Sequence, residues 1–233
     1  MLKKVFAAVL VLTAIWSVPA HAAEEAIPAE KVKSVQIFAE TCRWTGCYNT
    51  PVGSGFFLKG GYVITNHHVI NPYTKFLVKD GTGKTYAVDV YGYDNDYDLA
   101  MLRLRDPVDH PYFDLADDEK SAKFGSYASS SDAAFVHKEG LLLYSERSLT
   151  VDFNNKVISD RVRAVYSMQS IQGNSGAGIF DDQGKISGVV LAREDGTGNA
   201  AAVRLADLKD FVERMFDGND TNNRRLVIHE NKQ

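Results

Sequence analysis

The 233-residue sequence predicts an all-β protein made of two antiparallel barrels or sandwiches and closed by one C-terminal helix. Short apolar runs rich in β-branched and aromatic residues recur between Gly, Asn and Asp, which is the pattern of strands separated by turns. These runs form two clusters on either side of a proline-containing connection at 106–111. Helical periodicity is nearly absent before residue 200.

The first 22 residues have the three parts of a secretory signal peptide. Lys3 and Lys4 supply positive charge, an apolar run occupies 5–18, and the tripeptide 20–22 has the small-residue pattern of a cleavage site. The run is shorter than the roughly 20 residues of a membrane-spanning helix, so an uncleaved anchor is the less favoured alternative. We therefore expect a periplasmic or secreted mature chain that begins near Ala23 and has no membrane span.

The strands are expected in two groups. Residues 23–33, rich in Ala, Glu and Lys, are predicted to form a short arm without a core. The first cluster, about 34–108, has candidate strands at 35–38, 55–58, 62–65, 76–79, 86–93 and 99–104. The second cluster, about 109–204, has candidate strands at 133–136, 141–144, 161–166, 179–180, 186–191 and 201–204.

A helix is predicted over 205–216. Apolar residues recur there at helical spacing, with Asp207 in the first turn and Arg214 in the last, where each charge suits the helix dipole. The following residues, 217–233, are polar and are predicted to form a loose tail.

Composition excludes some classes of function and limits others. The formal net charge is -4 and no basic stripe is present, which argues against a nucleic-acid partner. The two cysteines, Cys42 and Cys47, lie close together, which in an exported chain favours a disulfide or a pair of free thiols. A zinc site is disfavoured because further Cys or His ligands at regular spacing are missing, and we expect no metal or cofactor.

A serine lies among glycines in the segment 172–178, Gln-Gly-Asn-Ser-Gly-Ala-Gly. Taken alone, Ser175 is weak evidence of a nucleophile, because Ser and Gly are common turn residues. Gly173 and Ser175 could, however, direct two backbone N–H groups at a substrate oxyanion. The segment differs from the G-x-S-x-G elbow, since Ala177 replaces the last glycine and no helical pattern follows, so an α/β-hydrolase is disfavoured.

A general base and an orienting carboxylate are also available. His67 and His68 follow a predicted strand, and because adjacent residues of an extended chain point to opposite sides, at most one of them should face a given site. Asp98 opens an apolar strand and could be buried, whereas Asp94 and Asp96 have turn-like surroundings and are expected to be solvated. Calcium binding by these three aspartates is the disfavoured alternative, because the Gly and Glu of an EF-hand loop are missing.

Three motifs in this order, TNHHV (65–69), DLAMLRL (98–104) and GNSGAG (173–178), resemble those of the trypsin-like (chymotrypsin-fold) serine proteases. GSGF at 53–56 makes the chain most similar to the bacterial HtrA/Deg-type branch. The resemblance covers about 34–216 and implies two antiparallel six-stranded β-barrels. It implies an exported endopeptidase that acts on proteins or peptides. A catalytically silent or latent binding module, and an esterase using the same triad, remain the alternatives.

The resemblance also assigns roles to residues. His68 rather than His67 would be the general base, Asp98 would orient it, and Ser175 would form the acyl-enzyme. The N–H groups of Gly173 and Ser175 would hold the oxyanion. In the substrate pocket, Gln169 would lie near the base, and the edge would be formed by Leu191, Ala192 and Arg193.

Several departures from the family pattern carry their own expectations. Ala177 stands where a second glycine is usual, and Asn174 replaces the aspartate of digestive enzymes, so we expect no propeptide activation through an N-terminal ammonium. Arg193 occupies a position that often holds a small residue, so it would narrow the pocket or favour acidic side chains, unless its guanidinium simply points to water. No PDZ domain is expected after the helix, and a monomer is expected because 23–33 have no strong apolar anchor.

Overall fold

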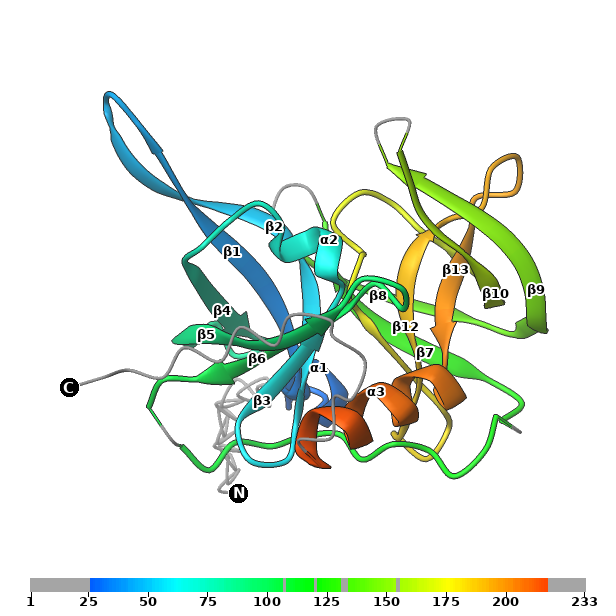
Figure 1. Ribbon diagram of the computed structural model, residues 1–233. Helices are drawn as coiled ribbons and strands as arrows, with labels where there is room; N and C mark the ends of the chain where they lie inside the picture. Colours follow the sequence, from blue (N-terminus) through cyan, green and yellow to red (C-terminus); the bar gives the residue numbers. More distant parts are fainter. Residues whose placement is uncertain (1–25, 107, 120, 131–133, 154–155, 218–233) are drawn as a thin grey trace, which may run out of the picture.

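The computed structural model describes residues 26–217 with the exception of 107, 120, 131–133 and 154–155. The predicted signal peptide at 1–22 and nearly all of the predicted tail lie outside the described residues. Two β-structures lie side by side, and helix α3 (Leu205–Asp217) packs against both (Figure 1). Within the described ranges, we find no helix with the length and apolar character to cross a membrane.

The first half is a closed antiparallel barrel of six strands in the order β1-β2-β3-β6-β5-β4. The strands are β1 (Ser34–Arg43), β2 (Gly46–Leu58), β3 (Tyr62–Thr65), β4 (Phe76–Asp80), β5 (Thr85–Asp94) and β6 (Leu99–Leu104). Two short helices accompany them: α1 (Ala29–Lys33), which has no buried residue, precedes β1, and α2 (His67–Ile70) follows β3. Apolar side chains such as Ile37, Phe57 and Leu102 fill the barrel.

The second half is an antiparallel sheet of seven strands in the order β8-β7-β11-β12-β13-β10-β9. The strands are β7 (Phe124–Ser129), β8 (Phe135–Gly140), β9 (Leu142–Phe153), β10 (Lys156–Gln169), β11 (Gly178–Phe180), β12 (Ile186–Arg193) and β13 (Asn199–Arg204). Only Leu141 separates β8 from β9, so the chain itself joins the two edges of the sheet. Counted as one bent strand, β8 and β9 give the six strands predicted for the second barrel, and the predicted all-β fold class is confirmed.

The two halves share a hydrophobic core to which α3 contributes one face. Leu208, Phe211 and Met215 of α3 are buried together with Phe56 of β2 and Val189 of β12. The helix contacts β6 of the first half as well as β12 and β13 of the second. The C-terminal helix therefore fixes the two halves relative to each other.

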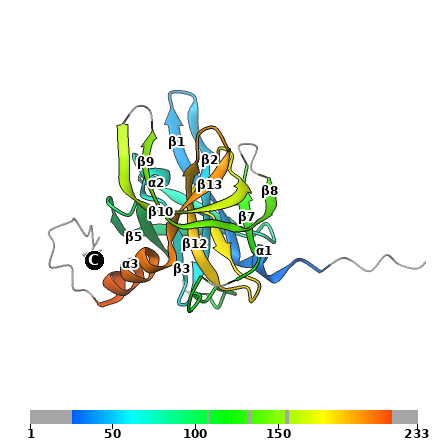
Figure 2. The same ribbon diagram turned by 90° about the vertical axis from the view of Figure 1, so that its right-hand side faces the viewer.

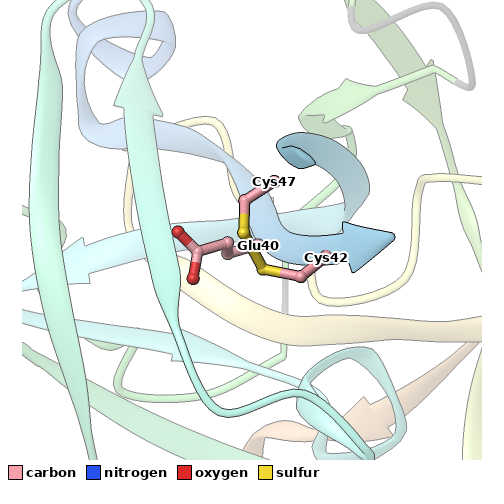
Figure 3. Close-up of side chains that lie close together, drawn as sticks. All are labelled: Glu40, Cys42 and Cys47. Carbon is pink, nitrogen blue, oxygen red and sulfur yellow. A yellow bond between two sulfur atoms is a disulfide. The ribbon is translucent and has the colours of Figure 1, made fainter. Parts of the chain in front are cut away.

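Two long hairpins, β1–β2 and β9–β10, project toward the same end of the molecule in both views (Figures 1 and 2). Near the tip of the first, Cys42 and Cys47 form a disulfide, and Trp44 between them is 98% exposed. The carboxylate of Glu40 lies close to both sulfur atoms (Figure 3). Neither sulfur of the disulfide is a thiolate, which is the form of cysteine that binds metals. The Glu40 carboxylate pairs with Lys75 at 2.8 Å. The disulfide and this ion pair therefore stabilise the hairpin.

The segment that connects the halves is anchored in the first barrel by a buried carboxylate. Asp80 accepts hydrogen bonds from Thr82 Oγ1 at 2.6 Å and Tyr86 Oη at 3.0 Å, and Nε2 of His110 in the connecting segment lies 3.1 Å from it. Burial by itself would raise the pKa of Asp80, but these hydrogen bonds together lower it. The buried group is therefore a carboxylate at neutral pH.

We expect Asp80 to make folding sensitive to acid. Because its pKa is lower in the folded than in the unfolded chain, its stabilisation is fully present above the unfolded value and is lost as the pH falls, below about pH 4. Asp80→Asn should lower the free energy of unfolding at pH 7 by about 1–3 kcal/mol and flatten the acid limb of a plot of melting temperature against pH. Asp89→Asn, a change at an exposed aspartate, should leave that limb intact. An unchanged acid limb in Asp80→Asn would contradict this expectation.

Candidate active site

His68 and Asp98 form a close pair between α2 and the start of β6. Nδ1 of His68 lies 2.5 Å from Oδ2 of Asp98, and the backbone N–H of His68 donates to Oδ1 at 2.9 Å. A carboxylate can only accept, so the proton belongs on Nδ1 of the neutral ring and Nε2 is the proton acceptor. Asp98 is 2% exposed, which shields the pair from water.

The backbone of Asp98 has an uncommon conformation. Its φ is 56°, and it is the one residue other than glycine with positive φ in the described part of the chain. A left-handed conformation costs a non-glycine residue about 1–2 kcal/mol, so neighbouring contacts must hold it. Asn66 Nδ2 and the N–H of His67 both donate to the carbonyl of Asp98, at 3.0 and 3.1 Å. The two residues before His68 thus hold the strained aspartate in place.

His67 has a different environment from its neighbour. The ring stacks on Tyr93 with the centroids 4.4 Å apart, and burial lowers the pKa of His67. The expectation of an extended chain at these two residues is wrong, because they lie in the single helical turn of α2, where adjacent side chains diverge by about 100°. This divergence still allows only His68 to face Asp98.

Ser175 lies on a tight turn before β11. Gly173 and Gly176 both have positive φ, 94° and 88°, which other residues rarely adopt. A Cβ at Gly176 would lie 2.1 Å from the carbonyl oxygen of Ser54, so the first barrel approaches this turn too closely for a side chain. The Ser175 hydroxyl donates to the carbonyl oxygen of Leu191 at 3.2 Å.

Ser54 on β2 links the first barrel to this turn. Its N–H donates to the Ser175 carbonyl at 2.8 Å and its hydroxyl donates to the Gly173 carbonyl at 2.7 Å. The hydroxyl in turn accepts the N–H of Ser129 at 2.7 Å. The GSGF motif at 53–56 predicted a family resemblance but no role for Ser54. Ser54 contacts residues about 120 positions away in the chain, which only the folded structure brings together. The motif itself was the only feature of the sequence that could have pointed to these contacts.

Asn174 shapes the same turn from inside the second half. Its Oδ1 accepts the N–H of Ile171 at 2.9 Å, and its Nδ2 donates to the Ser129 carbonyl at 2.8 Å. The side chain is buried, with 1% of it exposed. Ala177 is fully buried, and its methyl group fits the core of the second half, so the alanine that departs from the family pattern is accommodated there.

A groove of about 790 Å³ brings together most of the predicted site residues. The first half lines it with Thr50, Pro51, Val52, His68 and the segment 71–73, and the second half lines it with Gly173, Ser175, Leu191, Ala192 and Arg193. Arg193 is exposed. Gln169 is not among the groove residues: it lines a cavity of about 10 Å³ together with Asn174, and its Nε2 donates to Thr197 O at 3.3 Å.

Two β-structures that meet at a groove, with a His–Asp pair from the first and a glycine-flanked serine from the second, define the class of chymotrypsin-like folds. The order His, Asp, Ser along the chain agrees with this class. The chain belongs to the family described as trypsin-like peptidase domain, whose sequence profile matches residues 53–189.

Curated relatives point to one branch of this family. A probable periplasmic serine endoprotease, DegP-like, of Bartonella henselae is 28% identical over 170 residues, which cover 71% of this chain and 33% of that protein. The periplasmic pH-dependent serine endoprotease DegQ of Escherichia coli is 26% identical over 147 residues, which cover 60% of this chain and 31% of that protein. The chain therefore spans about a third of the length of these relatives.

Solved structures show the same fold. The HtrA-type protease AlgW with a decapeptide aligns with a TM-score of 0.65 at 14% identity and covers 80% of this chain and 65% of that chain. An inactive form of Rv3671c from M. tuberculosis aligns with a TM-score of 0.64 at 19% identity and covers 82% of this chain and 90% of that one. At these identities the likeness concerns the fold alone.

Proposed function

We propose that this chain is an exported serine endopeptidase that hydrolyses peptide bonds of proteins or peptides through an acyl-enzyme. The observation that carries the proposal is the 2.5 Å contact between His68 Nδ1 and Asp98 Oδ2, beside a groove that His68 and Ser175 both line. Membership of the trypsin-like peptidase family supports it, as do relatives named serine endoproteases.

In the proposed reaction, the Ser175 hydroxyl gives up its hydrogen bond to Leu191 O and donates to His68 Nε2 instead. The serine oxygen then attacks the substrate carbonyl. His68 takes the hydroxyl proton and then gives it to the leaving amine as the peptide C–N bond breaks. Asp98 keeps the other ring nitrogen protonated and stabilises the imidazolium. A water molecule, deprotonated by His68, then attacks the ester carbonyl and releases the acid together with free Ser175.

The proposed oxyanion hole consists of the N–H groups of Gly173 and Ser175. The positive φ of Gly173 supports this assignment, because such a backbone can direct an amide toward the groove where a Cβ would be strained. The bonds from Ser54 and Asn174 would keep these amides fixed during the reaction. Such preorganisation is what makes hydrogen-bond donors effective toward a developing charge.

We place the mature enzyme in the periplasm or outside the cell. The charge and apolar pattern of residues 1–22 supports export, and several relatives are named periplasmic. The disulfide between Cys42 and Cys47 is compatible with such an oxidising compartment.

A fluorophosphonate probe tests the nucleophile directly. We expect the purified chain to be labelled between pH 7 and 9, the range in which an ordinary imidazole is neutral, and Ser175→Ala to lose all labelling. Ser148→Ala, at an exposed serine of β9, is the matched control and should be labelled like the unchanged protein. A folded chain without Ser175-dependent labelling would instead indicate a silent binding module. A labelled chain that cleaves esters but no peptide would indicate an esterase.

We also propose that Arg193 selects for acidic side chains in the substrate. Arg193 is exposed and lines the groove beside Ala192, so its guanidinium can pair with a substrate carboxylate. In a peptide-library profile, Arg193→Ala should reduce the preference for Asp and Glu by about 5–10-fold, as expected for the loss of 1–1.5 kcal/mol. Arg105→Ala, on the outside of the first barrel, should leave the profile unchanged. An identical profile in Arg193→Ala would mean that the side chain only points to water.

A further inference from the structure

The turn just before Asp98 is held from outside the first barrel. The expectation that Asp94 is solvated is wrong: it is 3% exposed, because its Oδ1 accepts the N–H groups of Asp96 at 2.8 Å and Tyr97 at 3.1 Å within the turn. Its Oδ2 accepts Nη2 of Arg214, from α3, at 2.9 Å. Burial alone would raise the pKa of Asp94, but the hydrogen bonds from Tyr97 and Arg214 lower it. Asp94 is thus an ionised bridge between this turn and the C-terminal helix.

The ring of Tyr97 lies within reach of two guanidinium groups, both from the second half of the chain. Arg161 of β10 lies 4.6 Å from the ring centroid and Arg214 lies 5.3 Å from it, both at cation–π distance. Arg161 also pairs with Asp96 at 3.2 Å. Arg214 is itself oriented by Asp210, one helical turn earlier, with Nε donating at 3.0 Å. Ion pairs and ring contacts therefore hold both ends of the turn.

The position of this turn matters because Asp98 follows it directly. The left-handed backbone of Asp98 is strained, and both carboxylate oxygens must keep their bonds to His68 at 2.9 and 2.5 Å. On one side, β6 pairs with β3 and β5 and fixes the chain. On the other side, the turn at 94–97 is fixed by Arg214 and Arg161. A rigid turn is the condition for a precise contact between Asp98 and His68.

We propose that Arg214 is a positioning residue for the catalytic pair: through Asp94 and Tyr97 it holds Asp98 in the orientation that binds His68. The inference rests on the proposed function, since it gives α3 a part in the same reaction. Arg214 lies on a helix whose Leu208, Phe211 and Met215 are anchored in the core shared by the two halves. Its fork is shared between Asp210 and Asp94, a geometry that lysine cannot reproduce.

The test compares Arg214→Gln and Arg214→Lys with Arg204→Gln in the full chain. Arg204 is the matched control because it also pairs with two carboxylates next to α3, those of Asp207 and Glu146. For fluorophosphonate labelling, we expect Arg214→Gln to lower the maximal inactivation rate by about 10–100-fold with little change in the inhibitor concentration for half-maximal rate. Arg214→Lys should recover part of the rate, and Arg204→Gln should retain all of it.

A second readout does not depend on activity. The proton between His68 Nδ1 and Asp98 should give a low-field ¹H resonance, which Arg214→Gln should shift or broaden and Arg204→Gln should preserve. If Arg214→Gln keeps both the resonance and the rate, or only reduces the fraction of protein that is labelled at saturation, Arg214 is merely structural and the proposal is overturned. If the unchanged chain is not labelled at all, the proposed function fails, and the resonance still decides the role of Arg214.

Discussion

His68→Ala is expected to lower the rate of peptide hydrolysis by about 10⁶-fold, whereas His67→Ala should stay within about threefold of the unchanged chain. Without an imidazole at position 68, the proposed reaction has no general base to take the proton of the Ser175 hydroxyl. Hydrolysis of fluorescein-labelled casein and the rate of fluorophosphonate labelling measure both variants under the same conditions.

The paired variant is informative because the two histidines share a helical turn and differ in their partners. His67 stacks on Tyr93, while His68 binds both carboxylate oxygens of Asp98. Loss of the His67 ring should therefore appear as a modest fall in melting temperature rather than in rate. The reverse result, with His67→Ala inactive and His68→Ala active, would show that the base was assigned to the wrong residue.

The members of this pair could be proposed from the sequence, but their geometry could not. The motifs around His68, Asp98 and Ser175 are local and keep a fixed order, so three short segments were enough to indicate a chemistry. The positive φ of Asp98 and the helical turn at His67 arise from contacts between distant segments. Periodicity describes only one segment at a time, and it predicted an extended chain at His67.

The second half shows the same limit at the level of strands. Apolar runs predicted strands at 141–144 and 161–166, whereas β9 and β10 pair from one end of a long hairpin to the other. The residues at 143–148 are exposed, so backbone hydrogen bonds rather than burial continue the strand there. Burial patterns find strands with a face in a core and miss such extensions. For the same reason, the contact between Arg214 of α3 and Asp94, in the turn that precedes Asp98, could not be predicted from the sequence.

Asp98→Asn is expected to lower the turnover number by about 10⁴-fold while the chain remains folded. Asparagine has nearly the same size as aspartate. Its amide oxygen can still accept the backbone N–H of His68, which in the unchanged protein lies 2.9 Å from Oδ1 of Asp98. The amide nitrogen would then take the place of Oδ2, which in the unchanged protein lies 2.5 Å from His68 Nδ1, and would donate to that ring nitrogen. The proton of the neutral ring would move to Nε2, which could no longer accept the proton of Ser175.

The size of the fall in turnover number shows whether Asp98 acts by orienting the His68 ring or only by contributing a negative charge. Asp89→Asn, at a carboxylate that is 55% exposed and paired with Arg105, removes the same charge outside the groove and should leave the turnover number within about twofold. Turnover is measured with labelled casein, and thermal unfolding of both variants verifies the fold. If Asp98→Asn loses less than about tenfold, its carboxylate does not set the tautomer of His68, and the triad must be assigned differently. If the turnover number of Asp98→Asn falls about 10⁴-fold while the melting temperature is unchanged, the 2.5 Å contact between Asp98 and His68 serves catalysis rather than stability.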